Sequence, residues 1–232
     1  MLSYDDFFNN CKVINIEDED HWHKLRSKGI GGSDAGIIMN VSRFCTPYEL
    51  WEDKCGIKKR PFVTNEAIEK GNALEPIMFN QFKVFYQNRY EVINTKDISL
   101  KSLEHPFMRA NLDGALIEKQ TGRKGILEIK STTIYDSSMF KPWARDEMPI
   151  VYFFQCIHYL ITTQFDFVVL YAILDIPWKG DIGEQETRIV IINREDVLED
   201  MDLLLKEEKI FWNRVINRIE PPFLESRNKN LM

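Results

Sequence analysis

The stretch RANLDGALIEKQTGRKGILEIK, residues 109–130, carries the clearest structural signal in the chain. Two β-like runs, Arg109–Ile117 and Gly125–Lys130, stand on either side of a polar turn over Glu118–Lys124. Apolar runs that flank a short polar, glycine-containing segment are typical of a β-hairpin. The stretch therefore predicts two neighbouring strands of a sheet.

The same hairpin places three charged residues together. Residues two apart on a strand share a face, so Glu128 and Lys130 point the same way, while Leu127 and Ile129 point into the core. The turn would bring Asp113 close to Glu128. Two carboxylates suit Mg²⁺ or Mn²⁺, and a lysine beside them can orient a water or stabilise developing charge. The alternative is an exposed Glu-x-Lys strand face without a metal, a pattern that also arises by chance.

The rest of the chain alternates between helical and β-like segments. Helices are expected over His21–Asn40 with a glycine-rich break, Tyr48–Lys54, Glu66–Gln87, Ile150–Thr163 and Glu195–Ile219. Further strands are expected over Tyr90–Ile93, Ser99–Leu100, Phe165–Leu174 and Thr187–Ile192. This order predicts an α/β fold, a central mixed sheet flanked by helices.

Two helix boundaries are less regular. Ser33 or Asp34 would cap the helix after the glycine-rich break. Pro76 lies inside the Glu66–Gln87 segment, so a kink or a helix start near Asn72 is expected there.

Composition excludes several classes of protein. The chain has 232 residues, of which 44% are hydrophobic, and a net charge of −6, so it can bury a core and is not disordered by default. It contains no apolar run long enough for a membrane span and no secretory signal at its start, which predicts a cytoplasmic protein. The four cysteines lack zinc-ligand spacing. The sequence pI of about 5.4 argues against a blanket nucleic-acid coat but allows a local basic site.

Other segments offer further site residues. Glu75 lies on the apolar stripe of its helix, where a carboxylate needs a partner unless it lies at the helix start. Tyr152, Gln155 and Tyr159 share one face of the Ile150–Thr163 helix, where the glutamine needs a hydrogen-bond partner, although aromatic residues there also suit a core. Arg26 and Ser33, around the glycine-rich turn, indicate an anion pocket, a weak signal by itself.

Taken together, these blocks resemble the phage lambda exonuclease and YqaJ-type recombinase nucleases, a branch of the PD-(D/E)xK superfamily. The resemblance spans Trp22 to about Leu160. Its ordered blocks are Trp22–Arg26 with Gly31–Ala35, Gly71–Pro76, Leu112–Gly114 with Leu127–Lys130, and Gln155–Leu160. One departure is that Leu112 stands where the superfamily motif has a proline. The resemblance implies a single nuclease domain over residues 1–232, with a motif-bearing core of about 20–192 and a C-terminal helix of about 195–219.

The resemblance also implies a role for each matched residue. Asp113, Glu128 and the Ile129 carbonyl would be metal ligands, Lys130 the catalytic lysine, and Glu75 a support for a second metal or its water. Gln155 and Tyr152 would position the water or the scissile phosphate. Arg26 and Ser33 would receive a 5′ phosphate, with Asn111 standing where the lambda enzyme has a serine near that phosphate.

The implied activity is 5′→3′ digestion of one strand of linear duplex DNA, leaving a 3′ single strand for recombination in the cytoplasm of a bacterial host or phage-infected cell. The implied cofactor is Mg²⁺, with two ions per site and Mn²⁺ as a substitute. The implied partners are a single-strand annealing protein and two further copies in a ring-shaped trimer around DNA. Candidate basic residues for the channel are Lys24, Lys28, Lys54, Lys58, Lys59 and Arg60. The alternatives are an endonuclease of the same superfamily and a catalytically inactive DNA-binding module. An iron–sulfur nuclease is disfavoured because no cysteine follows Cys156.

Overall fold

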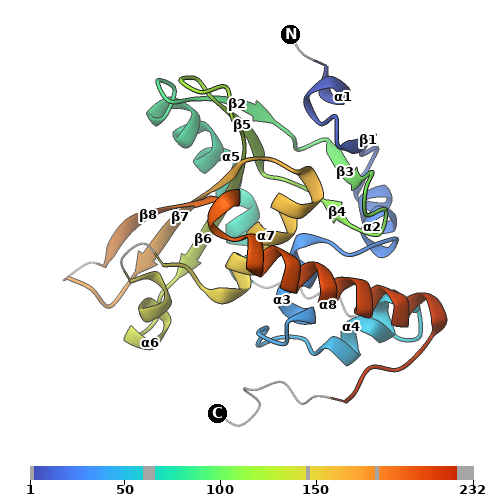
Figure 1. Ribbon diagram of the computed structural model, residues 1–232. Coiled ribbons are helices and arrows are strands. Elements are labelled where there is room, and N and C mark those ends of the chain that lie inside the picture. The colour runs from blue at the N-terminus through green and yellow to red at the C-terminus, as the bar shows by residue number, and fades with distance from the viewer. Residues whose placement is uncertain (1–2, 60–65, 145–146, 181–182, 224–232) are drawn as a thin grey trace.

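The computed structural model describes residues 3–59, 66–144, 147–180 and 183–223 (Figure 1). Its helices are α1 (Tyr4–Phe7), α2 (Glu19–Ser27), α3 (Gly32–Ile38), α4 (Pro47–Lys54), α5 (Glu66–Phe85), α6 (Ser137–Phe140), α7 (Ile150–Thr163) and α8 (Leu198–Asn217), with 3₁₀ turns at Lys141–Trp143 and Arg194–Asp196. Its strands are β1 (Cys11–Asn15), β2 (Tyr90–Asn94), β3 (Ile98–Ser102), β4 (Arg109–Ala110), β5 (Gly114–Glu118), β6 (Lys124–Thr133), β7 (Phe167–Ile176) and β8 (Glu184–Asn193). The predicted α/β class is confirmed.

The central sheet has five strands in the order β2-β5-β6-β7-β8. Only β6 and β7 are parallel, and α7 makes the crossover between them, which a parallel pair requires. The other neighbours in the sheet are antiparallel. The expected mixed sheet is therefore present, with its parallel pair at the strand that carries Glu128 and Lys130.

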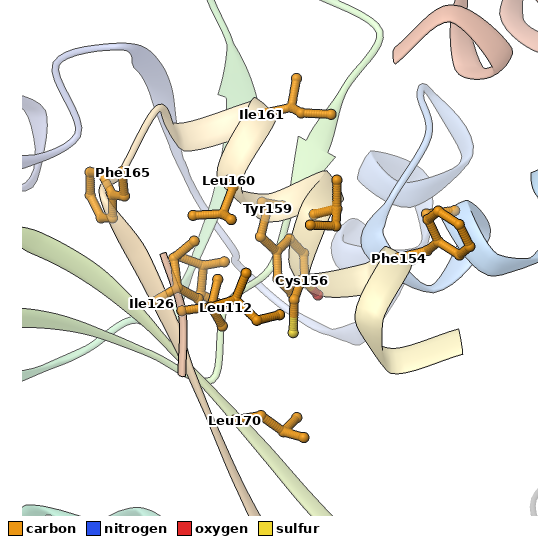
Figure 2. Close-up of a cluster of buried hydrophobic side chains, with 14 of the residues drawn as sticks. Leu112, Ile126, Phe154, Cys156, Tyr159, Leu160, Ile161, Phe165 and Leu170 are labelled. Carbon is orange, nitrogen blue, oxygen red and sulfur yellow. The ribbon is translucent and has the colours of Figure 1, made fainter. Parts of the chain in front are cut away.

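Helices cover both faces of this sheet, and the alternation along β6 shows which residue faces which helix. Leu127 and Ile129 pack with Met78 and Phe82 of α5 in one hydrophobic cluster. Ile126, two residues before Glu128, packs on the opposite face with buried residues of α7, as Figure 2 shows for Cys156 and Leu160. Glu128 and Lys130 share the face of Ile126, so both point toward α7.

A second, three-stranded sheet, β1-β3-β4, lies beside the first and splits the strand that was predicted over Arg109–Ile117. Ala110 pairs with Leu100 in the small sheet, whereas Gly114 pairs with Leu127 in the large one. The prediction of one strand was wrong because residues 111–113 cross from one sheet to the other. Asp113 is the last residue of this crossing.

The two irregular helix boundaries also differ from expectation. The N-cap of α3 is Gly31, and Asp34 reaches back to accept a hydrogen bond from the Gly31 amide at 3.0 Å, so neither Ser33 nor Asp34 is the cap. Helix α5 continues through Pro76 from Glu66 to Phe85, so it does not start near Asn72. In the part of the chain that the structure describes, no helix combines the length and apolarity that a bilayer crossing requires.

Candidate active site

Asp113 and Glu128 meet where the β5–β6 ladder ends. Gly114 pairs with Leu127, which places the preceding Asp113 opposite Glu128. Asp113 Oδ2 accepts a hydrogen bond from the Ile129 amide at 2.7 Å. The N–H and C=O of one residue in a strand point toward the same neighbour, so the Ile129 carbonyl also points toward Asp113. The structure thus brings together the three groups expected as metal ligands.

Two further side chains contact Glu128, one from its own strand β6 and one from helix α7. Lys130 Nζ lies 2.5 Å from Glu128 Oε1, and Gln155 Nε2 donates to the same oxygen at 2.6 Å. Lys130 also lies over the ring of Tyr152, 5.2 Å from its centre. Glu128 is 1% exposed, and its second oxygen, Oε2, is buried without a hydrogen-bond partner. The carboxylate therefore has one saturated oxygen and one that is available.

The electrostatics of the cluster favour an added positive charge. Burial and the neighbouring Asp113 carboxylate raise the pKa of Glu128 to about 8, against the opposing effect of Lys130. The pKa of Asp113 is also raised, chiefly by burial. Burial alone would lower the pKa of Lys130, but Glu128 and Asp113 outweigh it and raise that pKa. A single ammonium does not neutralise the carboxyl groups that meet here.

Glu75 approaches the cluster from α5. It is half-buried, and its pKa is raised by burial and by the charge of Asp113. Within residues 3–59, 66–144, 147–180 and 183–223, no three His, Cys, Asp or Glu side chains form a ready-made metal cage. Mg²⁺ does not need one, because it usually binds one or two carboxylates and keeps waters and substrate phosphates as its other ligands. The unpartnered Glu128 Oε2 and the excess of carboxyl groups fit such an ion.

Tyr159, which shares the helix face of Tyr152 and Gln155, also lies in this site. Its hydroxyl accepts from Gln155 Nε2 at 3.1 Å and donates to the Asn111 carbonyl at 3.1 Å. It thereby joins α7 to the segment that carries Asp113. A Cβ on Gly32 would lie 2.5 Å from the Tyr159 ring, so α3 packs directly on it. Its position four residues after Gln155 puts it on the same helix face, as expected from the sequence.

The expected 5′-phosphate residues are only partly brought together. Arg26 donates to Ser33 Oγ at 2.8 Å, and its guanidinium lies 4.5 Å from the centre of the Trp22 ring. Ser33 follows Gly32, which packs on Tyr159, so this pair lies next to the α7 face of the site. Asn111 contacts Tyr159 through its carbonyl, while its side-chain Oδ1 is buried without a partner.

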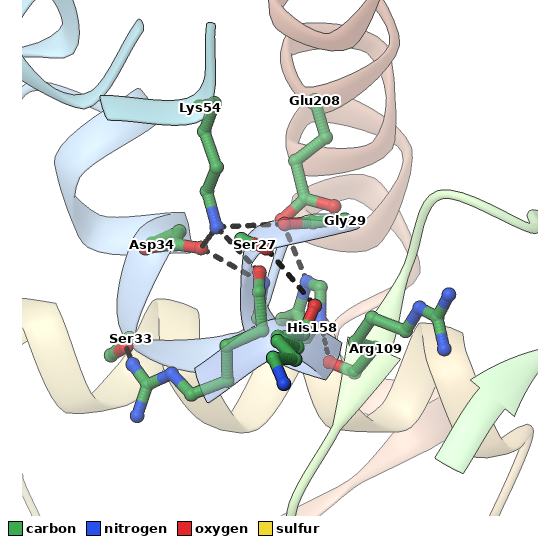
Figure 3. Close-up of polar contacts among 11 residues, drawn as sticks. Ser27, Gly29, Ser33, Asp34, Lys54, Arg109, His158 and Glu208 are labelled. Carbon is green, nitrogen blue, oxygen red and sulfur yellow. Dashed lines mark hydrogen bonds and ion pairs between the residues drawn. The ribbon is translucent and has the colours of Figure 1, made fainter. Parts of the chain in front are cut away.

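The prediction that Lys54 faces DNA in a channel is wrong. Lys54 forms an ion pair with Asp34 at 2.7 Å, and both side chains are almost fully buried, 4% and 3% exposed. Lys54 also donates to the carbonyls of Arg26 and Gly29, at 3.0 and 2.7 Å (Figure 3). It therefore stabilises the fold and is not available to DNA. The other candidates Lys24, Lys28, Lys58 and Lys59 are exposed, and Arg60 lies outside the described residues.

The fold is that of known exonucleases. The structure matches an alkaline exonuclease from Laribacter hongkongensis with a TM-score of 0.65 and 15% identity, covering 87% of this chain and 94% of that one. It also matches a phage-related exonuclease from Haemophilus somnus with a TM-score of 0.52 and 15% identity, over 85% of this chain and 99% of that one. At this level of identity, the likeness concerns the fold.

The family follows from sequence. The model of the YqaJ-like viral recombinase domain matches residues 21–166, well over half of the chain. The chain is also 33% identical over 206 residues to the uncharacterized protein YqaJ of Bacillus subtilis, which covers 89% of this chain but only 59% of that protein. The chain belongs to the YqaJ-like viral recombinase domain family, and it spans about three fifths of the length of this relative.

Proposed function

We propose that this protein is a metal-dependent deoxyribonuclease that digests one strand of linear duplex DNA from its 5′ end and leaves a 3′ single strand. The observation that carries the proposal is the cluster of Asp113, Glu128 and Lys130 at the end of the β5–β6 ladder, with Gln155 against it. Membership of a recombinase family and the exonuclease fold support the same reading.

Each residue of the cluster has a distinct task. Glu128, Asp113 and the Ile129 carbonyl, with Glu75 nearby, are the groups that would hold one or two Mg²⁺ ions. When bound, such ions activate a water and neutralise charge on the phosphate. Gln155 restrains Glu128 through its 2.6 Å hydrogen bond. The raised pKa of Lys130 keeps its ammonium protonated, so we assign it to stabilising negative charge that develops on the phosphate.

Arg26 and Ser33 support the proposed 5′→3′ direction of digestion. A terminal 5′ phosphate carries close to two negative charges near pH 7, and a guanidinium beside a hydroxyl matches it. The Arg26–Ser33 contact next to Tyr159 supports this placement. An end that is bound in this way re-enters the site after each cleavage, which favours stepwise digestion.

The test uses linear and covalently closed circular duplex with Mg²⁺. We expect loss of the linear form alone, with a 5′ label released as mononucleotide before a 3′ label. Mn²⁺ should replace Mg²⁺, whereas Ca²⁺ should support binding without cleavage because its coordination is looser. Cleavage of both forms would indicate an endonuclease, and no cleavage of either would indicate a DNA-binding module. Full activity in EDTA would contradict the metal mechanism.

We also propose a ring-shaped homotrimer and a single-strand annealing protein as partner, both on family grounds. Mass measurement in solution tests the first. Co-purification with a single-strand annealing protein, with and without DNA, tests the second. A monomer at micromolar concentration would contradict the ring.

A further inference from the structure

Three cations form a row on one face of the small sheet β1-β3-β4. Lys12 pairs with Lys101 across β1 and β3, and Lys101 pairs with Arg109 across β3 and β4. Directly opposed residues in antiparallel strands project to the same face, with side chains about 5 Å apart. The neighbours Cys11, Leu100 and Ala110 pack into the hydrophobic core, so the three cations project to the opposite face.

Arg109 is the unusual member of this row. It is only 7% exposed, yet its Nε and Nη1 atoms are buried without a hydrogen-bond partner. A Cβ on Gly29 would lie 2.8 Å from Arg109 Cγ, so the turn after α2 covers the side chain. Figure 3 shows the guanidinium pointing away from His158, whose Nε2 lies 2.8 Å from the Arg109 carbonyl oxygen. The Arg109 side chain and the Arg109 carbonyl therefore point in different directions from the strand.

Without a ligand, the three neighbouring cations lower the stability of the folded protein. Like charges opposed across strands repel, and buried guanidinium nitrogens without partners lose their hydration. Among the described residues, neither Lys12 nor Lys101 has a carboxylate within ion-pair distance. Lys28, next to Gly29, is exposed and adds a fourth positive charge nearby. An anion that bridges the row would relieve both costs.

We infer that Lys12, Lys101 and Arg109 bind consecutive phosphates of duplex DNA outside the active site. Three neighbouring strands span roughly 10 Å. B-form DNA presents a phosphate about every 3.4 Å of axis on each strand, and the rotation of the helix separates consecutive phosphates further, so the row is long enough for two. Single-stranded DNA is usually held by stacking on aromatic rings, and this face of the three strands carries only Lys12, Ile14, Ser99, Lys101 and Arg109. The inference rests on the proposed function for the identity of its ligand.

The experiment measures DNA affinity against salt for a variant with Lys12→Gln and Lys101→Gln. A 5′-phosphorylated fluorescent duplex is titrated by anisotropy with Ca²⁺ in place of Mg²⁺, from 50 to 300 mM salt. Each lost phosphate contact should reduce the slope of log affinity against log salt by about 0.9, and so weaken binding about eightfold at 0.1 M. The double variant should therefore lose a slope of about 1.8. Arg109 is left intact because its burial makes unfolding a competing effect.

The matched control is Lys206→Gln with Lys209→Gln, two exposed lysines of α8 with the same total charge change. It should keep the slope of the unaltered protein, and thermal melting should show all three proteins folded. An unchanged slope in the row variant, an equal loss in the control, or a loss confined to a single-stranded probe would overturn the inference. If the unaltered protein cleaves duplex DNA while the row variant binds as tightly, only the row is refuted. If the unaltered protein does not bind DNA, the proposed function fails as well.

Discussion

Two buried carboxylate–lysine pairs in this molecule have opposite electrostatics. The helix pair, Asp34 with Lys54, joins α3 to α4 at 2.7 Å, and the sheet pair, Glu128 with Lys130, lies on β6 at 2.5 Å. Burial raises the pKa of both carboxyl groups. At Asp34 that effect is outweighed by Lys54 and Arg26, and the pKa falls to about 2, whereas at Glu128 the Asp113 carboxylate adds to it and the pKa rises to about 8.

This difference in electrostatics indicates that the helix pair has a structural role and that the sheet pair belongs to a ligand site. Lys54, Arg26 and the Gly31 amide all favour the ionised form of Asp34, and Lys54 donates to two backbone carbonyls as well as to Asp34. The sheet pair instead has an excess of negative charge and an oxygen without a partner. Removing one member of a complete buried pair leaves an uncompensated charge and destabilises the fold, while a pair that is incomplete indicates a ligand. The following predictions test this distinction.

The largest effect is expected from Glu128→Gln, which removes the charge but keeps an acceptor for Gln155. DNA cleavage should fall at least ten-thousandfold, more than about 5 kcal/mol of transition-state stabilisation. The free energy of unfolding without metal should not fall, because repulsion with Asp113 is relieved. Gel assays and urea melts measure the two quantities. Near-normal turnover would refute the metal-site assignment.

Lys54→Met should have the reverse signature. It leaves Asp34 buried without its main cation, which costs about 3–5 kcal/mol of stability. Cleavage per folded molecule should change little. Adding Asp34→Asn should recover part of the loss, since it removes the stranded charge. If the single variant melts like the unaltered protein, the helix pair is not the stabilising element that its geometry indicates.

Arg26→Ala sharpens the comparison, because Arg26 supports Asp34 and also contacts Ser33. Loss of a charge-assisted contact should cost about 1.5–3 kcal/mol, roughly 10- to 150-fold in the preference for 5′-phosphate over 5′-hydroxyl ends. The measurement compares digestion rates on matched duplexes. Lys209→Ala, which removes an exposed positive charge from α8, is the control. If Arg26→Ala keeps the preference, the pocket is misassigned.

The pH dependence of stability should have opposite signs for the two pairs in metal-free protein. The lowered pKa of Asp34 gives stabilisation that is present above its unfolded value, near 3.9, and is lost as pH falls through about 2. The raised pKa of Glu128 gives stabilisation that is present below about 4.5 and is lost as pH rises through about 8. Each slope is at most about 1.4 kcal/mol per pH unit. Urea melts of the unaltered protein against Asp34→Asn and Glu128→Gln isolate the two slopes, and equal signs would contradict the comparison.

The smallest effect concerns the segment that carries Asp113. Thr95 Oγ1 donates to the Leu112 carbonyl at 2.6 Å, in a buried position next to that carboxylate. Thr95→Val should cost about 1 kcal/mol of stability and weaken Mn²⁺ binding several-fold, because the carbonyl is left without its donor. Thr95→Ser should restore both. Mn²⁺ titration by electron paramagnetic resonance measures the affinity, and an unchanged value in Thr95→Val would show that the hydrogen bond does not position Asp113.

The sequence by itself determined the local pattern of this protein. Periodicity located α7 over Ile150–Thr163 and the strand that bears Glu128 and Lys130, because alternation and helical spacing depend on near neighbours only. It also predicted that Asp113 lies close to Glu128, because the two residues flank a short hairpin, and the observed register sets them opposite each other. The roles of these residues in catalysis stay predictions.

Only the tertiary structure decided where each segment packs. The sequence does not show that the strand is interrupted at residues 111–113, because Ala110 and Gly114 belong to one continuous apolar pattern. The interruption arises because Ala110 pairs in the small sheet and Gly114 pairs in the large one. The sequence suggests that Lys54 is a surface cation, but in the structure it is buried in an ion pair with Asp34, twenty residues away in the sequence. Burial and charge pairing depend on contacts between distant segments, and these contacts decide which lysine completes the fold and which faces a site.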